Sequence, residues 1–328
     1  MATTMTRTSM VPPVDLLPDV LPTERLNTRA MPVRPLRDDL RRIPTVRNVI
    51  TVVMAVVQTF GVVIAAAVVD RWWAWVLAFL LMGRGHCLLN ILGHEAAHRL
   101  LFPNRRVNDF VGRWLLAYPT FQAFIGYRRA HFAHHRDELG PEEPDTALYR
   151  GYPIPADSWR RKLRRDLFGI SAYKNFRALW SSLRRGSVEA RQILAVQVVL
   201  LGGSIAAGAP LAYVVWILSW STLWKFSNRL RAIAEHGGME RSADRRRTTH
   251  VIRQTPLARY LMVPYNTGWH LAHHVDMGVP WRNLPALHAE LVRSGWLVAD
   301  VEYPSYRAFW KACSAGDPKT ATPASAPS

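Results

Sequence analysis

Two apolar runs separated by only Asp70 and Arg71 constrain the fold most strongly. Each run, 46–69 and 72–93, is long enough to cross about 30 Å of hydrocarbon as a helix. A two-residue connection leaves room only for a tight turn between the two helices, so they must run antiparallel. The sequence therefore predicts a membrane-spanning helical hairpin.

A second pair of apolar runs occurs later in the chain. Residues 192–207 and 211–226 flank a Gly208-Ala209-Pro210 turn, although the first of these runs is near the minimum length for spanning. We therefore expect an all-α integral membrane protein with four transmembrane helices in two hairpins. The polar segments between and after the hairpins would form a helical cap.

The basic residues predict the orientation. The 328-residue chain has 42 Lys and Arg against 24 Asp and Glu, a net charge of +18, which could indicate a nucleic-acid partner. The charge is segregated from the apolar runs, however, and only Arg71 lies in the two short turns. By the positive-inside rule, both termini and the cap are expected in the cytoplasm. We therefore predict a multi-pass protein of the cell membrane and no nucleic-acid partner.

The remaining segments complete the expected organisation. Residues 1–45 lack a signal-peptide pattern and are expected to be a cytoplasmic tail, and residues 46–312 a single membrane domain. The apolar stretch 110–125 is too short to cross and is interpreted as an interfacial or re-entrant helix. Residues 313–328, rich in Ala, Pro, Ser and Thr, are expected to be a disordered tail.

Histidine is the residue type that can carry chemistry here. Cys87 and Cys313 are far apart in the sequence, so no disulfide framework or CxxC site is expected. Nine of the 12 histidines form four groups on the predicted cytoplasmic side. The groups are HEAAH (His94, His98), HFAHH (His131, His134, His135), AEHGG (His236) and HLAHH (His270, His273, His274).

The spacing within these groups favours metal binding. Residues at i, i+3 and i+4 share one helix face, so each HxxHH triplet presents three imidazoles together. Imidazole binds Zn, Cu, Fe and Ni, and nine imidazoles are too many for one ion but fit two. A single histidine is more often a surface or core residue, and HEAAH alone also matches a zinc protease with Glu95 as general base. The recurrence of two triplets favours a di-metal site.

The three histidine motifs and their surroundings resemble the membrane fatty acid desaturase and hydroxylase family. HEAAH, HFAHH and HLAHH stand in the family's order, an acidic stretch containing Asp145 follows the second motif, and YNTGWHLAHHVDMGVPWRNLPALHAEL resembles the family's third motif with its sequel. The resemblance covers about 46–296. It implies that all nine histidines bind two non-haem iron ions. The family's asparagine four residues before His236 is Ala232 here, which leaves water, Asn90 or Asn228 for the remaining coordination position.

The resemblance also implies the reaction. An unactivated C–H bond offers neither an acidic proton nor an electrophilic carbon, so a redox metal using O₂ is required. The family's outcome is desaturation of a lipid or fatty acyl chain. Hydroxylation, or ketone formation on a lipid, terpenoid or carotenoid chain, is the alternative. The haem motif His-Pro-Gly-Gly is absent from the sequence, so we expect a separate ferredoxin-, rubredoxin- or cytochrome b5-like electron donor with its reductase. A non-catalytic metal-binding or lipid-surface protein is a further alternative.

Additional residues are candidates for supporting roles. Hydrogen bonds from polar neighbours can orient the ligand imidazoles, and the candidates are Asn90, Glu95, Asp145 and Glu235. Aromatic residues near the cap are candidates to line a substrate tunnel, with ordinary interfacial packing as the alternative; these are Trp114, Phe121, Phe124, Trp269 and Trp281. The arginine-rich stretch 160–185 is expected to contact anionic lipid headgroups, an acidic electron carrier or an acyl-thioester phosphate.

Overall fold

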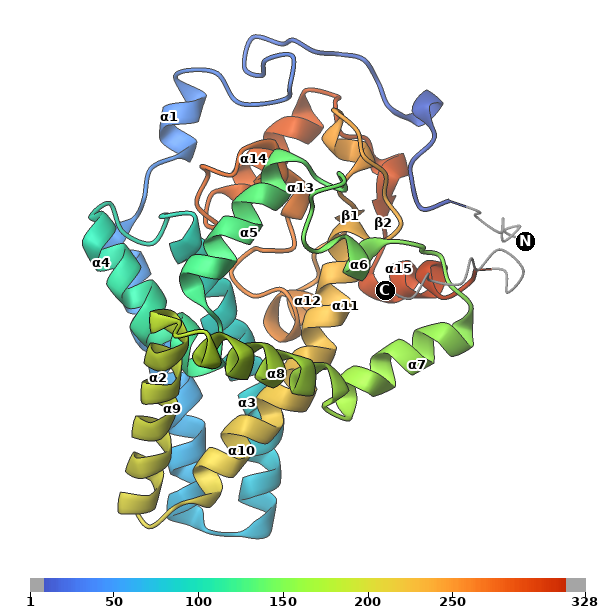
Figure 1. Cartoon of the computed structure of the whole chain (residues 1–328). Coiled ribbons are helices and arrows are strands. Elements are labelled where there is room, and N and C mark those ends of the chain that lie inside the picture. Colours follow the sequence, from blue (N-terminus) through green and yellow to red (C-terminus); the bar gives the residue numbers. More distant parts are fainter. Residues whose placement is uncertain (1–8, 317–328) are drawn as a thin grey trace.

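The computed structural model describes residues 9–316 and is almost entirely helical (Figure 1). The described part contains one small sheet, in which β1 (Val251–Ile252) pairs in parallel with β2 (Glu302–Tyr303). A bundle of long helices forms one end of the molecule, and shorter helices form the other end (Figure 1). We refer to these parts as the bundle and the cap.

The bundle consists of α2 (Thr45–Val69), α3 (Trp72–Ala97), α9 (Val188–Ala206) and α10 (Leu211–Ser219). The turns α2–α3 and α9–α10 lie at the same end, away from the cap (Figure 1). Large apolar side chains remain exposed on its outer face, including Val53, Ile64, Val68 and Val199. An apolar surface of this kind is typical of contact with a membrane.

Three helical segments are long and apolar enough to cross a membrane: Leu36–Val69, Trp72–Ala97 and Val188–Ala206. The second extends four residues beyond its predicted end at Gly93, because HEAAH continues the helix. The third begins four residues before its predicted start, where the Ser187 hydroxyl accepts a hydrogen bond from the Ala190 N–H.

The fourth predicted span, 211–226, is not among these three segments. Its helix is α-helical only to Ser219, continues as a π-helix over Trp220–Trp224, and then becomes α11 (Lys225–His236). The π-helical turns and the charged residues after Trp224 interrupt the apolar α-helical run. The continuous helical path nevertheless leads from the bundle to His236 in the cap.

The predicted helix over 110–125 differs from the structure. Helix α4 (Arg105–Phe110) continues as a π-helix over Val111–Ala117 and a 3₁₀ turn over Tyr118–Thr120. Phe121, with φ of 58°, ends this path, and α5 (Phe124–Arg136) begins a new helix. Left-handed backbone at a bulky residue breaks a helix, which the apolar pattern alone did not reveal.

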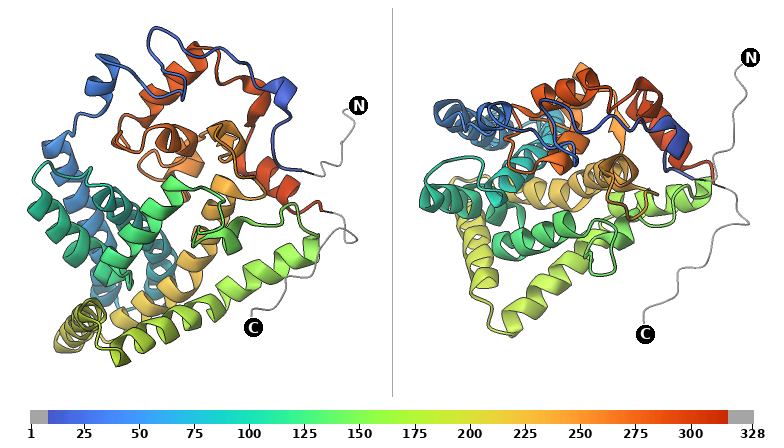
Figure 2. Two further views of the ribbon diagram at one scale, coloured as in Figure 1. Left: turned by 45° about the horizontal axis from the view of Figure 1, so that its top comes forward. Right: turned by 90° about the horizontal axis from the view of Figure 1, so that it is seen from above.

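The remaining helices lie in or around the cap. They are α1 (Leu36–Leu40), α6 (Thr146–Tyr149), α7 (Ala156–Leu167), α8 (Ile170–Arg184), α12 (Pro256–Leu261), α13 (His270–Val275), α14 (Leu284–Arg293) and α15 (Tyr306–Cys313). Helices α7 and α8 run along one side of the molecule (Figure 2).

Both terminal segments pack more closely than expected. Leu26 and Ala30 are fully buried against α13 and α14, and Arg41 donates a 3.0 Å hydrogen bond to Asp276. The segment predicted as an N-terminal tail therefore covers the cap from residue 9 onward (Figure 1). The domain was predicted to end at residue 312, but Cys313 is buried in α15. The packed part of the chain therefore extends past the predicted boundary. The rest of the predicted C-terminal tail, from 317, lies outside the described residues.

Candidate metal centre

Four helices bring the nine histidines of the sequence motifs into one buried cluster in the cap. His94 lies on the last turn of α3 and His98 at its end, and the HFAHH and HLAHH triplets lie on α5 and α13. His236 is the last residue of α11. The predicted convergence of residues from distant parts of the chain is therefore observed.

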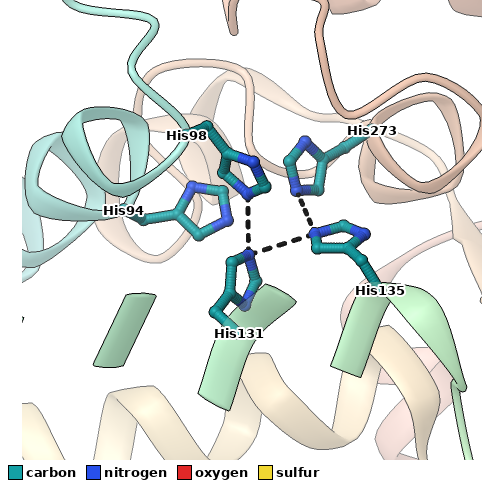
Figure 3. Close-up of side chains that lie close together, drawn as sticks. All are labelled: His94, His98, His131, His135 and His273. Carbon is teal, nitrogen blue, oxygen red and sulfur yellow. Dashed lines mark hydrogen bonds between the residues drawn. The ribbon is translucent and has the colours of Figure 1, made fainter. Parts of the chain in front are cut away.

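The first group consists of His94, His98, His131, His135 and His273, whose ring nitrogens all lie within 4.8 Å of one another. The imidazoles face a common centre (Figure 3). The Nε2 of His131 lies 2.8 Å from that of His98 and 3.1 Å from that of His135. The Nε2 atoms of His135 and His273 are 3.0 Å apart.

The second group contains His134, His236 and His274. His270 also belongs to it, because its ring contacts two of these three. The Nε2 of His270 lies 3.1 Å from that of His236 and 3.0 Å from that of His274. The Nε2 atoms of His134 and His274 are 3.4 Å apart. The two groups adjoin, because the rings of His135 and His274 stack with centroids 4.3 Å apart.

These distances fit metal coordination. Nitrogens bound to one ion at about 2.1 Å, at tetrahedral or octahedral angles, lie about 3.0–3.4 Å apart. The Nε2 separations of 2.8–3.4 Å in both groups match that range closely. The donor set can therefore hold two metal ions, with five imidazoles around one and four around the other.

In three of the histidines, Nδ1, the ring nitrogen that does not face the other imidazoles, lies next to an oxygen acceptor. The Nδ1 of His134 is 2.6 Å from Glu143 Oε1, and that of His236 is 2.8 Å from the Thr248 carbonyl. The Nδ1 of His274 contacts Glu138. Such partners fix the tautomer and direct Nε2 toward the metal position.

Glu138 and Glu143 were missed by the sequence analysis. Both lie in the acidic stretch after HFAHH, from which only Asp145 was selected. The structure gives Glu138 further partners, Arg245 at 2.6 Å and the hydroxyl of Thr248. Neither contact has a local sequence signal, because more than 100 residues separate the partners.

Burial controls the protonation of the cluster. Burial, reinforced by the charge of neighbouring histidines, lowers the pKa of His98, His131, His135 and His273 well below the ordinary value. The same holds for His236, His270 and His274. Burial also lowers the pKa of His134, but the hydrogen bond and charge of Glu143 outweigh it and leave that pKa raised. Neutral imidazole is the form that binds metal.

Asn90 contacts no ligand imidazole, whereas the carboxylates of Glu95 and Glu235 each lie near one, with Glu95 Oε1 3.7 Å from His94 Nδ1. The Asn90 amide donates to the His86 carbonyl at 2.8 Å, and the Glu95 carboxylate accepts from the Trp281 N–H at 3.3 Å. Asp145 lines the cavity beside the cluster, and burial raises its pKa. Glu235 pairs with Arg231 and lies 3.6 Å from His270 Nδ1.

A cavity of about 330 Å³ adjoins both groups. Six of the nine histidines line it: His94, His131, His134, His236, His270 and His273. Of the five aromatic residues predicted to line a tunnel, Phe121 is at this wall and the other four are not. Trp114 packs on Tyr118, Phe124 is fully buried under Arg128, Trp269 contacts Arg259, and Trp281 packs on Tyr265.

A buried histidine cluster at the end of apolar helices defines a membrane protein whose cap can bind metal. The chain belongs to the fatty acid desaturase family, whose family model matches residues 70–309. That match includes every residue of both histidine groups and confirms the resemblance of the sequence motifs. The desaturase family is metal-dependent, membrane-bound and made up of oxidoreductases.

Three characterised relatives are similar to the chain. Dihydrorhizobitoxine desaturase of Bradyrhizobium elkanii is 26% identical over 232 residues, 64% of this chain and 65% of the relative. The chloroplastic omega-3 fatty acid desaturases of Glycine max and Ricinus communis are 30% and 32% identical over 132 and 100 residues, 40% and 30% of this chain. These alignments cover 27% and 22% of the plant enzymes. The chain thus matches less than two-thirds of each relative's length.

Proposed function

We propose that the protein is an O₂-dependent di-iron oxidoreductase that introduces a double bond into an aliphatic acyl chain. The observation that carries the proposal is the pair of adjoining histidine groups beside one cavity. The five-histidine group would hold one iron, and His134, His236, His270 and His274 would hold the other. Iron at these positions would supply the oxidising power for C–H cleavage with O₂ as co-substrate and electrons from a separate donor protein.

The residues of the chain position the substrate and exclude water. The cavity wall between the bundle and the histidines is formed largely by α3 and α11, with Tyr127 of α5 and Tyr149 of α6 close to the imidazoles. Tyr127 stacks on His131 with centroids 5.3 Å apart, and Tyr149 contacts His236 at 5.0 Å. Holding the acyl chain of the substrate in a site that excludes bulk water favours oxidation of the bound carbon over side reactions.

The proposed topology is four spans with the cap in the cytoplasm of a cell-membrane protein. In support, both hairpin turns lie at the end opposite the cap (Figure 1), and Arg71 is the only Lys or Arg in these two turns. Helix α8 lies across the bundle at the cap side (Figure 1) and exposes Tyr173 and Trp180 beside several arginines. That combination is typical of a helix at the membrane interface. The proposed domain is 46–312, with residues 9–45 packed onto it.

A zinc protease is disfavoured by the surroundings of HEAAH. His94 and His98 share their centre with three further histidines, whereas a zinc protease leaves one position open for water. The Glu95 carboxylate accepts a backbone N–H from Trp281 and is absent from the metal-compatible groups in the described part of the chain.

Metal analysis and product analysis test the proposal together. The purified protein should contain about two iron ions per chain, and a host expressing it should accumulate an unsaturated product that a His273→Ala variant does not produce. Growth under ¹⁸O₂ distinguishes the outcomes, because an alkene carries no label whereas a labelled alcohol or ketone would reassign the protein to hydroxylation or ketone formation. One zinc ion per chain without an oxidised product would contradict the proposal.

A further inference from the structure

The cavity beside the histidines is polar at the end away from them. One face of α11 forms its long wall, with Lys225, Asn228, Arg231 and Glu235 spaced three, three and four residues apart. From Lys225 to His236 this face extends about 16 Å, at 1.5 Å per residue. The cavity therefore joins the metal centre to a charged residue at the border between the cap and the bundle.

Lys225 and Arg231, the two cationic residues on this face of α11, differ in whether they have an ion-pair partner. The Arg231 guanidinium donates to Glu235 at 2.5 Å and to Asn228 at 3.1 Å, so its charge is compensated. Lys225 has no ion pair within the described residues, and its Nζ lies 3.9 Å from the centre of the Trp220 ring. An ammonium without an ion-pair partner next to an apolar span is costly, and such residues commonly mark functional sites.

An unused hydrogen-bond donor lies beside Lys225. Trp220 is 2% exposed and lines the cavity, yet its Nε1–H has no hydrogen-bond partner. Phe121, also at the cavity wall, packs on the Trp220 ring with centroids 4.7 Å apart.

We propose that Lys225 and the Trp220 Nε1–H form a carboxylate-binding site, and that the substrate is a short aliphatic acid bound as the free anion. This inference rests on the proposed function, because the chain of the acid would extend from Lys225 toward the histidines. A buried N–H without a partner is costly, and a carboxylate would accept from the Trp220 Nε1–H and the Lys225 ammonium together.

Charge and volume favour a short carboxylate over a lipid phosphate. Lys225 has no ion-pair partner among the described residues, and its single charge matches a monoanion. Phosphate is typically recognised by an arginine fork, and the Arg231 fork is occupied by Glu235 and Asn228. The volume of about 330 Å³ is at the low end of the 300–1,000 Å³ typical of ligand pockets. A short chain therefore fits the cavity.

Binding in the absence of O₂ and electron donor tests this site without requiring turnover. The iron-loaded, full-length protein in lipid nanodiscs is titrated with octanoate, methyl octanoate and octyl phosphate by calorimetry, with empty nanodiscs as the blank. Octanoate should bind at least tenfold more tightly than its methyl ester. Equal affinity for acid and ester would overturn the proposal, and tighter binding of octyl phosphate would overturn its assignment to a carboxylate.

Variants then assign the effect to Lys225. Lys225→Gln should weaken octanoate binding at least tenfold and leave methyl octanoate unchanged, whereas Lys225→Arg, which retains the charge, should preserve most of the octanoate affinity. Lys174→Gln, at an exposed position of α8 that does not line the cavity, should change neither. Unchanged octanoate binding in Lys225→Gln, or an equal loss for acid and ester, would contradict the site.

The iron content separates this inference from the function on which it rests. A preference for the acid in a protein that lacks two iron ions per chain would refute the oxidoreductase and leave the carboxylate site standing. Two iron ions per chain without that preference would refute the site alone.

Discussion

The Nδ1 of His134 lies 2.6 Å from Oε1 of Glu143, and both side chains are buried. The carboxylate holds the imidazole so that Nε2 faces His274 across the second histidine group. Glu143→Ala removes this support, and losses of about 10–100-fold in metal affinity are typical of such changes. Iron titration against a competing chelator should show a loss of this size at one of the two sites.

Glu142→Ala is the matched control for this prediction. Glu142 is the preceding residue in the same loop and is exposed, so its substitution should leave both iron affinities at the wild-type value. Equal losses in the two variants would mean that the loop as a whole, and not the Glu143 carboxylate, affects the site.

Loss of one imidazole from a triplet should abolish turnover while the fold persists. In His273→Ala the first group loses a donor that lies 3.0 Å from His135, and water replaces it poorly. We expect about one iron ion per chain in place of two, no detectable product and an unchanged circular dichroism spectrum. His134→Ala should do the same at the second group.

His288→Ala provides the comparison for these variants. His288 lies on α14, outside both histidine groups, and its loss should leave iron content and product unchanged. Substantial residual product from His273→Ala or His134→Ala would show that the lost imidazole is not a required ligand.

The histidine motifs predicted the site because their spacing is local. Residues three and four apart share a helix face whatever the tertiary structure, so the sequence alone indicated which side of each helix carries the imidazoles. The apolar runs predicted the bundle for the same reason. The contact of His274 with Glu138, and that of Arg41 with Asp276, join residues 136 and 235 positions apart. No local pattern encodes such contacts, and for this reason the supporting carboxylates and the packed N-terminal segment were missed.

The break at Phe121 shows a second limit. An apolar stretch indicates burial, but the left-handed backbone that separates two helices at this residue depends on packing against Trp220 and Phe176.

The cavity wall is a third case. Aromatic residues were predicted as its lining, whereas Lys225, Asn228 and Arg231 of α11 form much of it. Which face of α11 points inward depends on how α11 packs against α3 and α7.

Acid should destabilise the metal-free protein. Burial lowers the pKa of His131, His135, His270 and His273, so unfolding is accompanied by proton uptake once the pH falls below about 6.5, the ordinary histidine value. Each proton taken up reduces the free energy of unfolding by about 1.4 kcal/mol per pH unit. His134, with its raised pKa, contributes in the opposite direction.

Thermal unfolding of the metal-free protein at pH 7.5 and pH 5.5 checks the sign. The melting temperature should be lower at pH 5.5, and the decrease should be smaller in a His270→Gln/His273→Gln double variant, which lacks two of the responsible groups. An equal or higher melting temperature at pH 5.5 would contradict the expected proton uptake.

Gly112 allows two metal-bearing helices to approach. A Cβ at this position would lie 2.7 Å from the Ala96 Cβ and equally close to the Phe124 ring. Ala96 stands between His94 and His98, and Phe124 begins the helix of the second motif. Gly112→Val should therefore overpack this contact, cost about 1–3 kcal/mol of stability and weaken iron binding.

Thermal unfolding and iron content of Gly112→Val test that expectation against Gly61→Ala. Gly61 lies on α2, and a Cβ there meets nothing within 4 Å, so this change should be neutral or slightly stabilising. Wild-type stability and iron content in Gly112→Val would mean that the contact of α3 with the π-helical segment is not tight.

Cysteine labelling tests the four-span topology. Cys87 and Cys313 are buried, so an introduced exposed cysteine should dominate the reaction with a membrane-impermeant thiol reagent. Arg71 and Ala207 stand at the two hairpin turns and Arg105 at the cap, all of them exposed. In intact cells the reagent should label Arg71→Cys and Ala207→Cys at once, and Arg105→Cys only after permeabilisation. If Ala207→Cys behaves like Arg105→Cys, then α9 and α10 do not cross, and the second hairpin must lie along one membrane surface. Because a hairpin returns the chain to the side it left, all four metal-bearing segments stay on one side in either case, and the labelling decides only whether the second hairpin spans the membrane.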